Sequence, residues 1–206
     1  MLPTPEQFLQ KSLLNCNLLE LKMSLILGYA NKDNAIIMSD GRAGKDGCYS
    51  EHYNKTRKIN DNIILGFAGF VESTEYFLDH VLSQMGNERN EYYIDDFWEL
   101  ITFLMDDPRL HERFHSSFII IGRDKNRQMY NSTIGNSTQF TLQKHIITNP
   151  RVSAIGGSID GKIIEKIYMD NITKFEIPIK DCMINTINQV AELDSSVNTN
   201  YFSSTI

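Results

Sequence analysis

The stretch that decides how this chain folds covers residues 23–69 and reads MSLILGYANKDNAIIMSDGRAGKDGCYSEHYNKTRKINDNIILGFAG. It contains apolar runs of strand length at residues 24–30, 35–40 and 63–68. The turn cluster Asn-Lys-Asp-Asn between the first two runs predicts a hairpin, and a polar loop with a glycine is expected over residues 43–54. A short strand should follow this loop. We therefore expect the whole stretch to form antiparallel sheet.

The rest of the chain alternates between helical and strand patterns. Apolar residues recur at helical spacing over residues 94–105, and the pattern ends before Pro108. The predicted helices cover residues 73–85, 94–105, 162–169 and 179–193, and the predicted strands cover 117–122, 128–133, 139–142, 152–157 and 200–204. Two groups of strands and two pairs of helices predict an α+β domain with helices on both outer faces of packed sheets.

Composition and charge argue against several classes of protein. The chain has 206 residues, 41% of them apolar and 22% charged, which is typical of one well-buried globular domain. A formal net charge of −6 gives no basic surface for nucleic acid, and no apolar run approaches the roughly 18 residues of a membrane span. We therefore expect neither nucleic acid nor a membrane as a partner. The three widely spaced cysteines suit no disulfide framework, which favours a cytoplasmic location.

Residues 1–23 are predicted to be an extension of the domain that covers residues 24–206. The segment has no basic start, and polar residues interrupt its apolar positions, so it does not resemble a secretory signal. Three interpretations stay open for it: an ordinary N-terminal helix, a propeptide that is removed, and a translated extension upstream of a true start at Met23.

Four polar or glycine positions along the strands suggest a reaction. A hydroxyl is a weak nucleophile unless a base takes its proton, and the α-amine of an N-terminal residue can be that base. A nearby cation would lower the pKa of the hydroxyl, a carboxylate would hold the cation, and a backbone N–H at a glycine turn would bind an oxyanion. Ser24, Asp40, Lys55 and Gly69 supply these groups in chain order.

These residues and the motifs around them resemble the β subunits of the proteasome and the related HslV peptidase, among the N-terminal nucleophile (Ntn) hydrolases. The motifs are the apolar strand from Ser24, Asp40-Gly41-Arg42-Ala43, Lys55, Gly66-Phe67-Ala68-Gly69 before a helix, and Ala154-Ile155-Gly156-Gly157 before the third helix. The resemblance covers nearly everything after Met23. It implies a four-layer αββα sandwich in which helices flank two antiparallel sheets.

The resemblance implies a role for each matching residue. Ser24 would be the nucleophile, with its own freed α-amine as the base. Asp40 and Lys55 would form the charge pair that tunes it, and the N–H of Gly69 would bind the oxyanion. Phe67 falls where the family has the floor of its first specificity pocket.

Two supporting positions of the family match less closely. The family's serine after the sheet turn falls at Gly157 here, unless Ser158 takes its place. Its later aspartate is represented by Asp194, which two serines follow without the family's glycines. Ser158 and Asp194 are therefore the candidates for a supporting role.

The first position of the domain also departs from the family. Threonine is usual there, preceded by glycine where a propeptide is cleaved, whereas here Met23 precedes Ser24. Removal of an initiator methionine would expose the serine amine without self-cleavage. Serine lacks the methyl group that restricts the rotamers of threonine, so we expect a slower enzyme.

In function, the resemblance implies a threonine- or serine-type endopeptidase that hydrolyses amide bonds in peptide or protein substrates. It also implies a homo-oligomeric ring, an ATPase unfoldase as a partner, and no cofactor. The alternative is a proteasome-like subunit with a structural or regulatory role and no catalysis, in which Ser24 is a plain strand residue.

A rival site lies at residues 111–115, where His-Glu-Arg-Phe-His matches the H-E-x-x-H pattern of zinc proteases. The apolar strand from residue 117 follows at once, which leaves little room for the long helix that such a site requires. No Asp or Glu between His115 and Asp124 offers a third ligand. A zinc hydrolase using His111, Glu112 and His115 is therefore a minor alternative.

Overall fold

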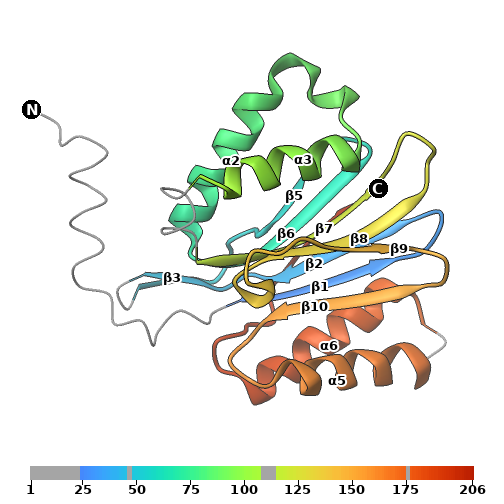
Figure 1. The fold of residues 1–206 in the computed structure, drawn as a ribbon. Coiled ribbons are helices and arrows are strands. Elements are labelled where there is room, and N and C mark those ends of the chain that lie inside the picture. Colours follow the sequence, from blue (N-terminus) through green and yellow to red (C-terminus); the bar gives the residue numbers. More distant parts are fainter. Residues whose placement is uncertain (1–23, 46–47, 108–114, 175–176) are drawn as a thin grey trace, which may run out of the picture.

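The protein consists of two antiparallel sheets with a pair of helices on each outer side (Figure 1). A computed structural model describes residues 24–45, 48–107, 115–174 and 177–206. Residues 1–23, with the three interpretations of them, lie outside the described part of the chain.

The first sheet contains the hairpin that the sequence predicts. Its strand order is β10-β1-β2-β11, and each neighbouring pair is antiparallel. The strands are β1 (Leu25–Ala30), β2 (Ala35–Asp40), β10 (Arg151–Gly156) and β11 (Tyr201–Thr205). Because β1 and β2 occupy the centre of the sheet, nearly all of their residues are buried.

The second sheet is a meander with the order β5-β6-β7-β8-β9, in which each strand pairs with the next along the chain. Its strands are β5 (Thr56–Lys58), β6 (Ile63–Gly69), β7 (Ser116–Arg123), β8 (Met129–Gly135) and β9 (Gln143–Ile146). Between the two sheets along the chain lies a small hairpin of β3 (Ala43–Lys45) and β4 (Cys48–Ser50). The expectation of a plain loop in this region is therefore wrong.

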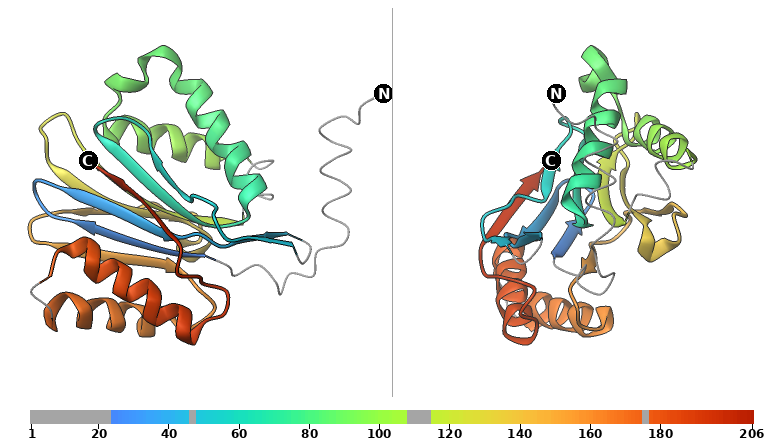
Figure 2. Two further views of the ribbon diagram at one scale, coloured as in Figure 1. Left: turned by 180° about the vertical axis from the view of Figure 1, so that it is seen from behind. Right: turned by 90° about the vertical axis from the view of Figure 1, so that its left-hand side faces the viewer.

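Helices cover the outer face of each sheet (Figures 1 and 2). They are α2 (Val71–Met85) and α3 (Ile94–Met105) on the five-stranded sheet, and α5 (Gly161–Lys174) and α6 (Ile179–Leu193) on the four-stranded sheet. The short 3₁₀ helices are η1 (Gly86–Glu91) and η2 (Asn136–Thr138). The predicted bounds of α3 and α6 are confirmed to the residue, since apolar periodicity and a nearby proline marked both helices.

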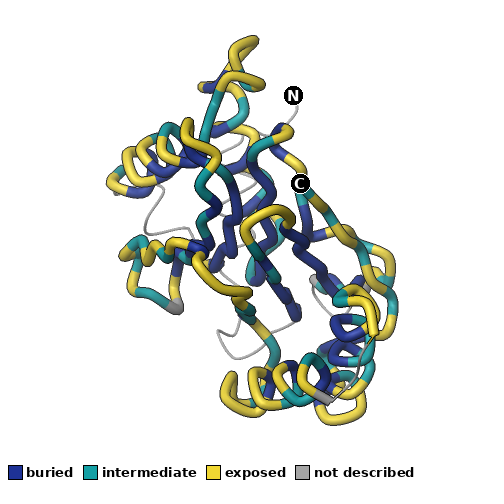
Figure 3. The backbone as a smooth tube through the Cα atoms, turned by 90° about the vertical axis from the view of Figure 1, so that its right-hand side faces the viewer, coloured by how far each residue is buried: buried dark blue, intermediate teal, exposed yellow. Residues whose placement is uncertain are grey.

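Three apolar layers hold the elements together. The layer between the second sheet and the helices α2 and α3 includes Phe77, Trp98 and Phe118. The layer between the two sheets includes Ile26, Ile37 and Ile119. The layer under α5 and α6 includes Leu27, Met38, Tyr168 and Ile187. Figure 3 shows this arrangement as dark blue strands inside helices whose outer turns are yellow. Full burial of one such side chain contributes about 1.5–3 kcal/mol, so the three layers dominate the stability of the fold.

The four-layer αββα sandwich expected from the resemblance is thus confirmed: helices, sheet, sheet, helices. Among the described residues, no helix has both the length and the apolar character needed to cross a membrane.

The predicted strand at residues 139–142 is wrong. Gln139 and Phe140 follow the turn η2 and have positive φ angles of 51° and 58°, a conformation that a strand does not allow. The strand β9 begins only at Gln143. Apolar and β-branched residues in this short segment fit a strand pattern equally well, so the pattern did not reveal the turn.

The two sheets approach each other closely at Gly66 in β6. A Cβ atom at this position would lie 2.6 Å from the Cγ2 atoms of both Ile26 and Ile37, which belong to the opposite sheet. Carbon atoms this close overlap, so any side chain at residue 66 must push the sheets apart or displace both isoleucines.

We expect Gly66→Val to lower the free energy of unfolding by about 1–3 kcal/mol or more, the usual effect of forcing extra volume into a packed core. Gly161→Ala is the matched control, because a Cβ atom at Gly161 meets nothing within 4 Å. Urea unfolding of both variants measures the difference. Equal stability of the two would show that the sheets are not tightly packed at residue 66.

Candidate active site

A buried ion pair between Asp40 and Lys55 forms the centre of the candidate site. Asp40 is the last residue of β2, and Lys55 directly precedes β5. Lys55 Nζ lies 2.7 Å from Asp40 Oδ1, and the two side chains are 1% and 0% exposed. The carbonyl of Lys55 accepts a hydrogen bond of 3.1 Å from the N–H of Phe67, which fixes the lysine backbone against β6. The predicted charge pair is therefore present in the fold.

Backbone groups from three segments complete the surroundings of the Asp40 carboxylate. The N–H of Leu25 donates to Oδ1 at 2.8 Å, the same oxygen that accepts from Lys55. The N–H groups of Arg42 and Asn198 donate to Oδ2 at 3.1 and 3.4 Å. A carboxylate with four donors is held in one orientation, and this supports its charge inside the protein.

Burial lowers the pKa of Lys55 from its ordinary value, and the neighbouring charge of Asp40 offsets only part of this effect. Lys55 therefore releases its proton more readily than an exposed lysine.

Ser24 lies at the same end of the first sheet, immediately before β1, and is only 2% exposed. Its carbonyl accepts a 2.6 Å hydrogen bond from the N–H of Gly157. The next residue in the chain, Leu25, donates to Asp40 as described above, so Ser24 is held next to the ion pair from both sides. Gly156 has a φ angle of 93°, and a Cβ atom there would lie 1.8 Å from the Ser24 carbonyl oxygen. Only glycine fits beside Ser24 at that position.

Gly69 ends β6 with a φ angle of 135°, which also requires glycine. A Cβ atom there would lie 2.4 Å from the carbonyl oxygen of His115 and from Ser116 Oγ. The preceding residue, Ala68, lies 3.1 Å from where a Cβ atom of Gly156 would be, so β6 ends beside the turn that holds Ser24. The structure thus brings Gly69 to the same end of the sheets, and its oxyanion role stays a prediction.

Ser158 and Asp194 are joined directly, although 36 residues separate them in the sequence. Ser158 Oγ donates to Asp194 Oδ1 at 2.8 Å, and the N–H of Ser158 donates to Oδ2. Ser196 donates to Oδ1 through both its N–H and its hydroxyl, at 2.9 and 2.5 Å. Ser158 adjoins Gly157, the residue bound to the Ser24 carbonyl. The supporting pair therefore borders the candidate nucleophile.

Two opposing effects act on the pKa of Asp194, whose residue is 2% exposed. Burial acts to raise this pKa, and the hydrogen bonds from Ser196 and Ser158 together outweigh burial and lower it below its ordinary value. Asp194 is therefore a stable carboxylate at neutral pH.

The structure does not bring the Phe67 side chain to this group, although the N–H of Phe67 bonds to the Lys55 carbonyl. Its side chain is fully buried in the layer under α2 and α3, and it packs edge-on against Tyr53 and Phe118, with ring centroids 6.5 and 6.4 Å away. The Arg57 guanidinium lies 5.9 Å from the centre of its ring. The pocket-floor role of Phe67 stays a prediction, and the ring is already enclosed by its neighbours.

The zinc alternative gains no support. His111 and Glu112 lie outside the described residues, and His115 is exposed, with its ring 5.7 Å from that of Phe70. Within the described ranges, no group of three His, Cys, Asp or Glu side chains is arranged to hold a metal ion.

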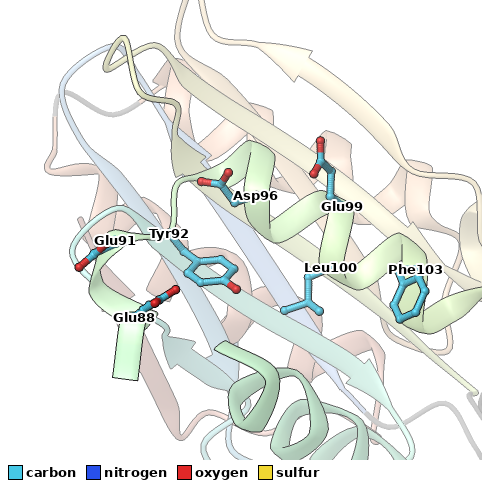
Figure 4. A pocket seen from close by; sticks show the side chains of 7 residues that line it. All are labelled: Glu88, Glu91, Tyr92, Asp96, Glu99, Leu100 and Phe103. Atoms are coloured by element: carbon cyan, nitrogen blue, oxygen red, sulfur yellow. The ribbon is translucent and has the colours of Figure 1, made fainter. Parts of the chain in front are cut away.

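A cavity of about 520 Å³ lies elsewhere, between η1 and α3 (Figure 4). It is lined by Glu88, Glu91, Tyr92, Asp96, Glu99, Leu100 and Phe103. None of these residues belongs to the group around Asp40, and the lining offers no activated nucleophile. We therefore place the candidate active site at the buried ion pair and not at this cavity.

Comparison with models of protein families gives one match. Residues 23–102 match the family model described as "Proteasome subunit". Less than half of the chain is thus similar to proteasome subunits at the level of sequence. The matched segment contains Ser24, Asp40, Lys55 and Gly69.

A solved structure extends the likeness to most of the chain. The crystal structure of eukaryotic HslV from Trypanosoma brucei matches with a TM-score of 0.66 and 15% sequence identity, covering 88% of this chain and 98% of that one. At this identity the likeness shows the fold alone. A search of the curated proteins found no match.

The site also contains a residue that the sequence reasoning missed. Asn198 donates to Asp40 and lies four positions after Asp194, in a segment without helical or strand periodicity. Nothing in that local pattern indicates that it contacts a residue near the start of the chain.

We expect Asp194→Asn to lower the free energy of unfolding at pH 7 by about 1.5–3 kcal/mol, since hydrogen bonds to ionised groups contribute about that much. The pKa of Asp194 is lower in the folded chain, so its contribution is present above the unfolded pKa and is lost as the pH falls through the folded pKa. Urea titrations of both chains should therefore differ at pH 7 and converge as the pH falls below about 4.

Asp79→Asn is the control for this experiment, because Asp79 is an exposed carboxylate of α2. It should change stability little at any pH. A difference between the Asp194→Asn chain and the unaltered chain that stays the same from pH 7 to pH 3 would contradict the assignment of Asp194 as a charged acceptor.

Proposed function

We propose that this proteasome-like chain is an Ntn hydrolase that cleaves amide bonds in peptides or proteins, with Ser24 as the nucleophile. The observation that carries the proposal is the buried ion pair of Lys55 and Asp40, whose Oδ1 also binds the N–H of Leu25, the residue next to Ser24. Isolating two charges from water is costly, and the fold does so beside a serine at the start of a strand.

In the proposed reaction, the Ser24 hydroxyl passes its proton to the free α-amine of the same residue. Its oxygen bonds to the substrate carbonyl carbon, and the Gly69 N–H stabilises the oxyanion. The ammonium then returns the proton to the leaving nitrogen as the C–N bond breaks, which leaves an acyl ester on Ser24. Water hydrolyses the ester, assisted by the same amine. Lys55 stabilises the negative charge that develops on the serine oxygen.

The proposal requires that the Met23–Ser24 bond is absent from the mature chain, because a peptide nitrogen cannot serve as the base. Removal of Met23 from a chain that starts there, or cleavage after it, would each produce the amine. The proposal further includes assembly into a homo-oligomeric ring, an ATPase unfoldase as a partner and a cytoplasmic location. No step of the proposed reaction requires a cofactor.

An inactive structural or regulatory subunit of the same fold is the second candidate. Two features of the sequence favour it: Met23 precedes the first position where the family's cleaved members have glycine, and serine stands where threonine is usual. The same buried ion pair would then be a remnant of catalysis.

The intact mass of the purified protein is the first test. A mature chain that begins at Ser24 is expected, and one that retains residues 1–23 would contradict the amine's role as base.

Covalent labelling provides the second test, with a peptide electrophile that bonds both to a hydroxyl and to the adjacent amine. We expect Ser24→Ala to abolish labelling and Lys55→Ala to slow it by about 100-fold or more, the usual effect of losing a group that stabilises developing negative charge. Lys58→Ala is the matched control, since this β5 lysine forms a surface ion pair with Asp61 and is half-exposed. No labelling of an unaltered chain that starts at Ser24 would favour the inactive subunit.

A further inference from the structure

The segment between α6 and β11 lies against the candidate site and is held there by Asn198, which is 7% exposed. Asn198 Oδ1 accepts a hydrogen bond of 2.8 Å from the N–H of Gly41. Asn198 Nδ2 donates to the carbonyl oxygen of Glu51 at 3.0 Å and to its carboxylate. Because a backbone N–H only donates and a carboxylate only accepts, the amide orientation is fixed by its partners. Every side-chain polar atom of Asn198 is therefore bonded.

These side-chain contacts position the backbone of the same residue. Gly41 directly follows Asp40, so the bond from its N–H to Asn198 places Asn198 beside that carboxylate. The N–H of Asn198 then donates to Asp40 Oδ2 at 3.4 Å. Asn198 thus contacts both Asp40 and the residue that follows it.

Glu51 and Arg42 form the outer part of this arrangement. The Glu51 carboxylate accepts from Arg42 Nε at 3.0 Å and Nη2 at 3.2 Å, and hydrogen bonds from Asn198 and Arg42 lower its pKa. Arg42 Nη1 also donates to the carbonyl of Ser195, and Asn200 Nδ2 donates to the carbonyl of Glu51 at 2.9 Å. The segment is therefore fixed on both sides of Asn198.

Residues 194–198 contact both carboxylates of the site. Asp194 accepts hydrogen bonds from Ser196 and from Ser158, and Ser158 adjoins the turn that holds the Ser24 carbonyl. Asn198 bonds to Asp40, the partner of Lys55. A shift of this segment would disturb both groups together.

We propose that Asn198, held by Glu51 and Arg42, is a positioning residue that keeps Asp40 and Asp194 in the geometry needed for reaction at Ser24. This inference rests on the proposed function. Loss of the Asn198 side chain releases the segment, and Asp40 Oδ2 then loses one of its two donors. The carboxylate interacts more strongly with Lys55, whose ammonium becomes harder to deprotonate.

The test measures labelling of Ser24 by the same peptide electrophile, separated into binding affinity and the rate of bond formation. Asn198→Ala should slow bond formation by about tenfold or more with little change in affinity, because a lost hydrogen bond to an ionised group typically has at least that effect. The alkaline limb of the pH profile should move to higher pH. The groups that set this limb are Lys55, its neighbours Asp40 and Arg42, and the α-amine of Ser24.

Exchange of the two polar partners provides a second variant pair. Asn198→Asp places a carboxylate against Glu51 and should slow labelling at least as much as Asn198→Ala. Adding Glu51→Gln restores an amide donor facing a carboxylate, so the double variant should regain part of the rate. Glu51→Gln alone changes a half-exposed side chain and is expected to fold.

Asn171→Ala is the control for a purely structural effect. Asn171 is a buried asparagine of α5, 2% exposed, whose Nδ2 donates to Thr186 at 3.0 Å. This variant should lose stability in urea and keep the rate and pH profile of the unaltered chain. Folded Asn198 variants that label at the unaltered rate with the unaltered pH profile would overturn the role of Asn198 and leave the proposed function intact. An unaltered chain that is never labelled would remove both.

Discussion

The arrangement of the candidate site depends above all on the buried contact between Asp40 and Lys55. Neither charge is solvated, and the cost of removing each from water is several kcal/mol even after relaxation. The fold compensates by directing three backbone N–H groups at Asp40, and these come from β1, from the residues after β2 and from the segment before β11. Parts of the chain that are 158 residues apart must meet at one carboxylate for this to happen. Since apolar side chains of similar size would often be at least as stable, stability alone does not explain the pair.

Strand register explains why these groups meet at one end of the sandwich. In the first sheet, Leu25 at the start of β1 pairs with Gly156 at the end of β10, and Asp40 at the end of β2 pairs with Tyr201 at the start of β11. These four strand termini therefore lie at the same end of the first sheet. The second sheet contributes the end of β6, and the close packing at Gly66 brings the two sheets within reach of each other. The site is a consequence of antiparallel pairing in both sheets at once, so a register shift of one residue in either would separate its parts.

The sequence predicts α2, α3, α6 and the opening strands well because their signals are local, whereas α5 extends to Lys174, beyond the predicted end at residue 169. The apolar period of residues 94–105 and the proline before Ile179 are sufficient to place α3 and α6. Residues 139–142 are too short for their pattern to distinguish a strand from a turn with left-handed residues. The site residues Asp40, Lys55 and Asp194 came from resemblance to a family, since a lone aspartate or lysine has no local signature of burial. Asn198 was not found at all, because its importance lies only in contacts with Gly41, Asp40 and Glu51, which the tertiary fold creates.

The net charge of the buried site residues bears on the proposed role of the N-terminal amine. Asp40 is matched by Lys55, whereas Asp194 accepts from the N–H and hydroxyl groups of Ser158 and Ser196. These three buried residues together therefore have one negative charge in excess. Ser24 lies between the two groups, joined to Asp40 through Leu25 and to the Ser158 turn through its carbonyl. A free amine at Ser24 would supply the missing positive charge when protonated. The net negative charge of these three residues favours the charged form of that amine over its neutral form.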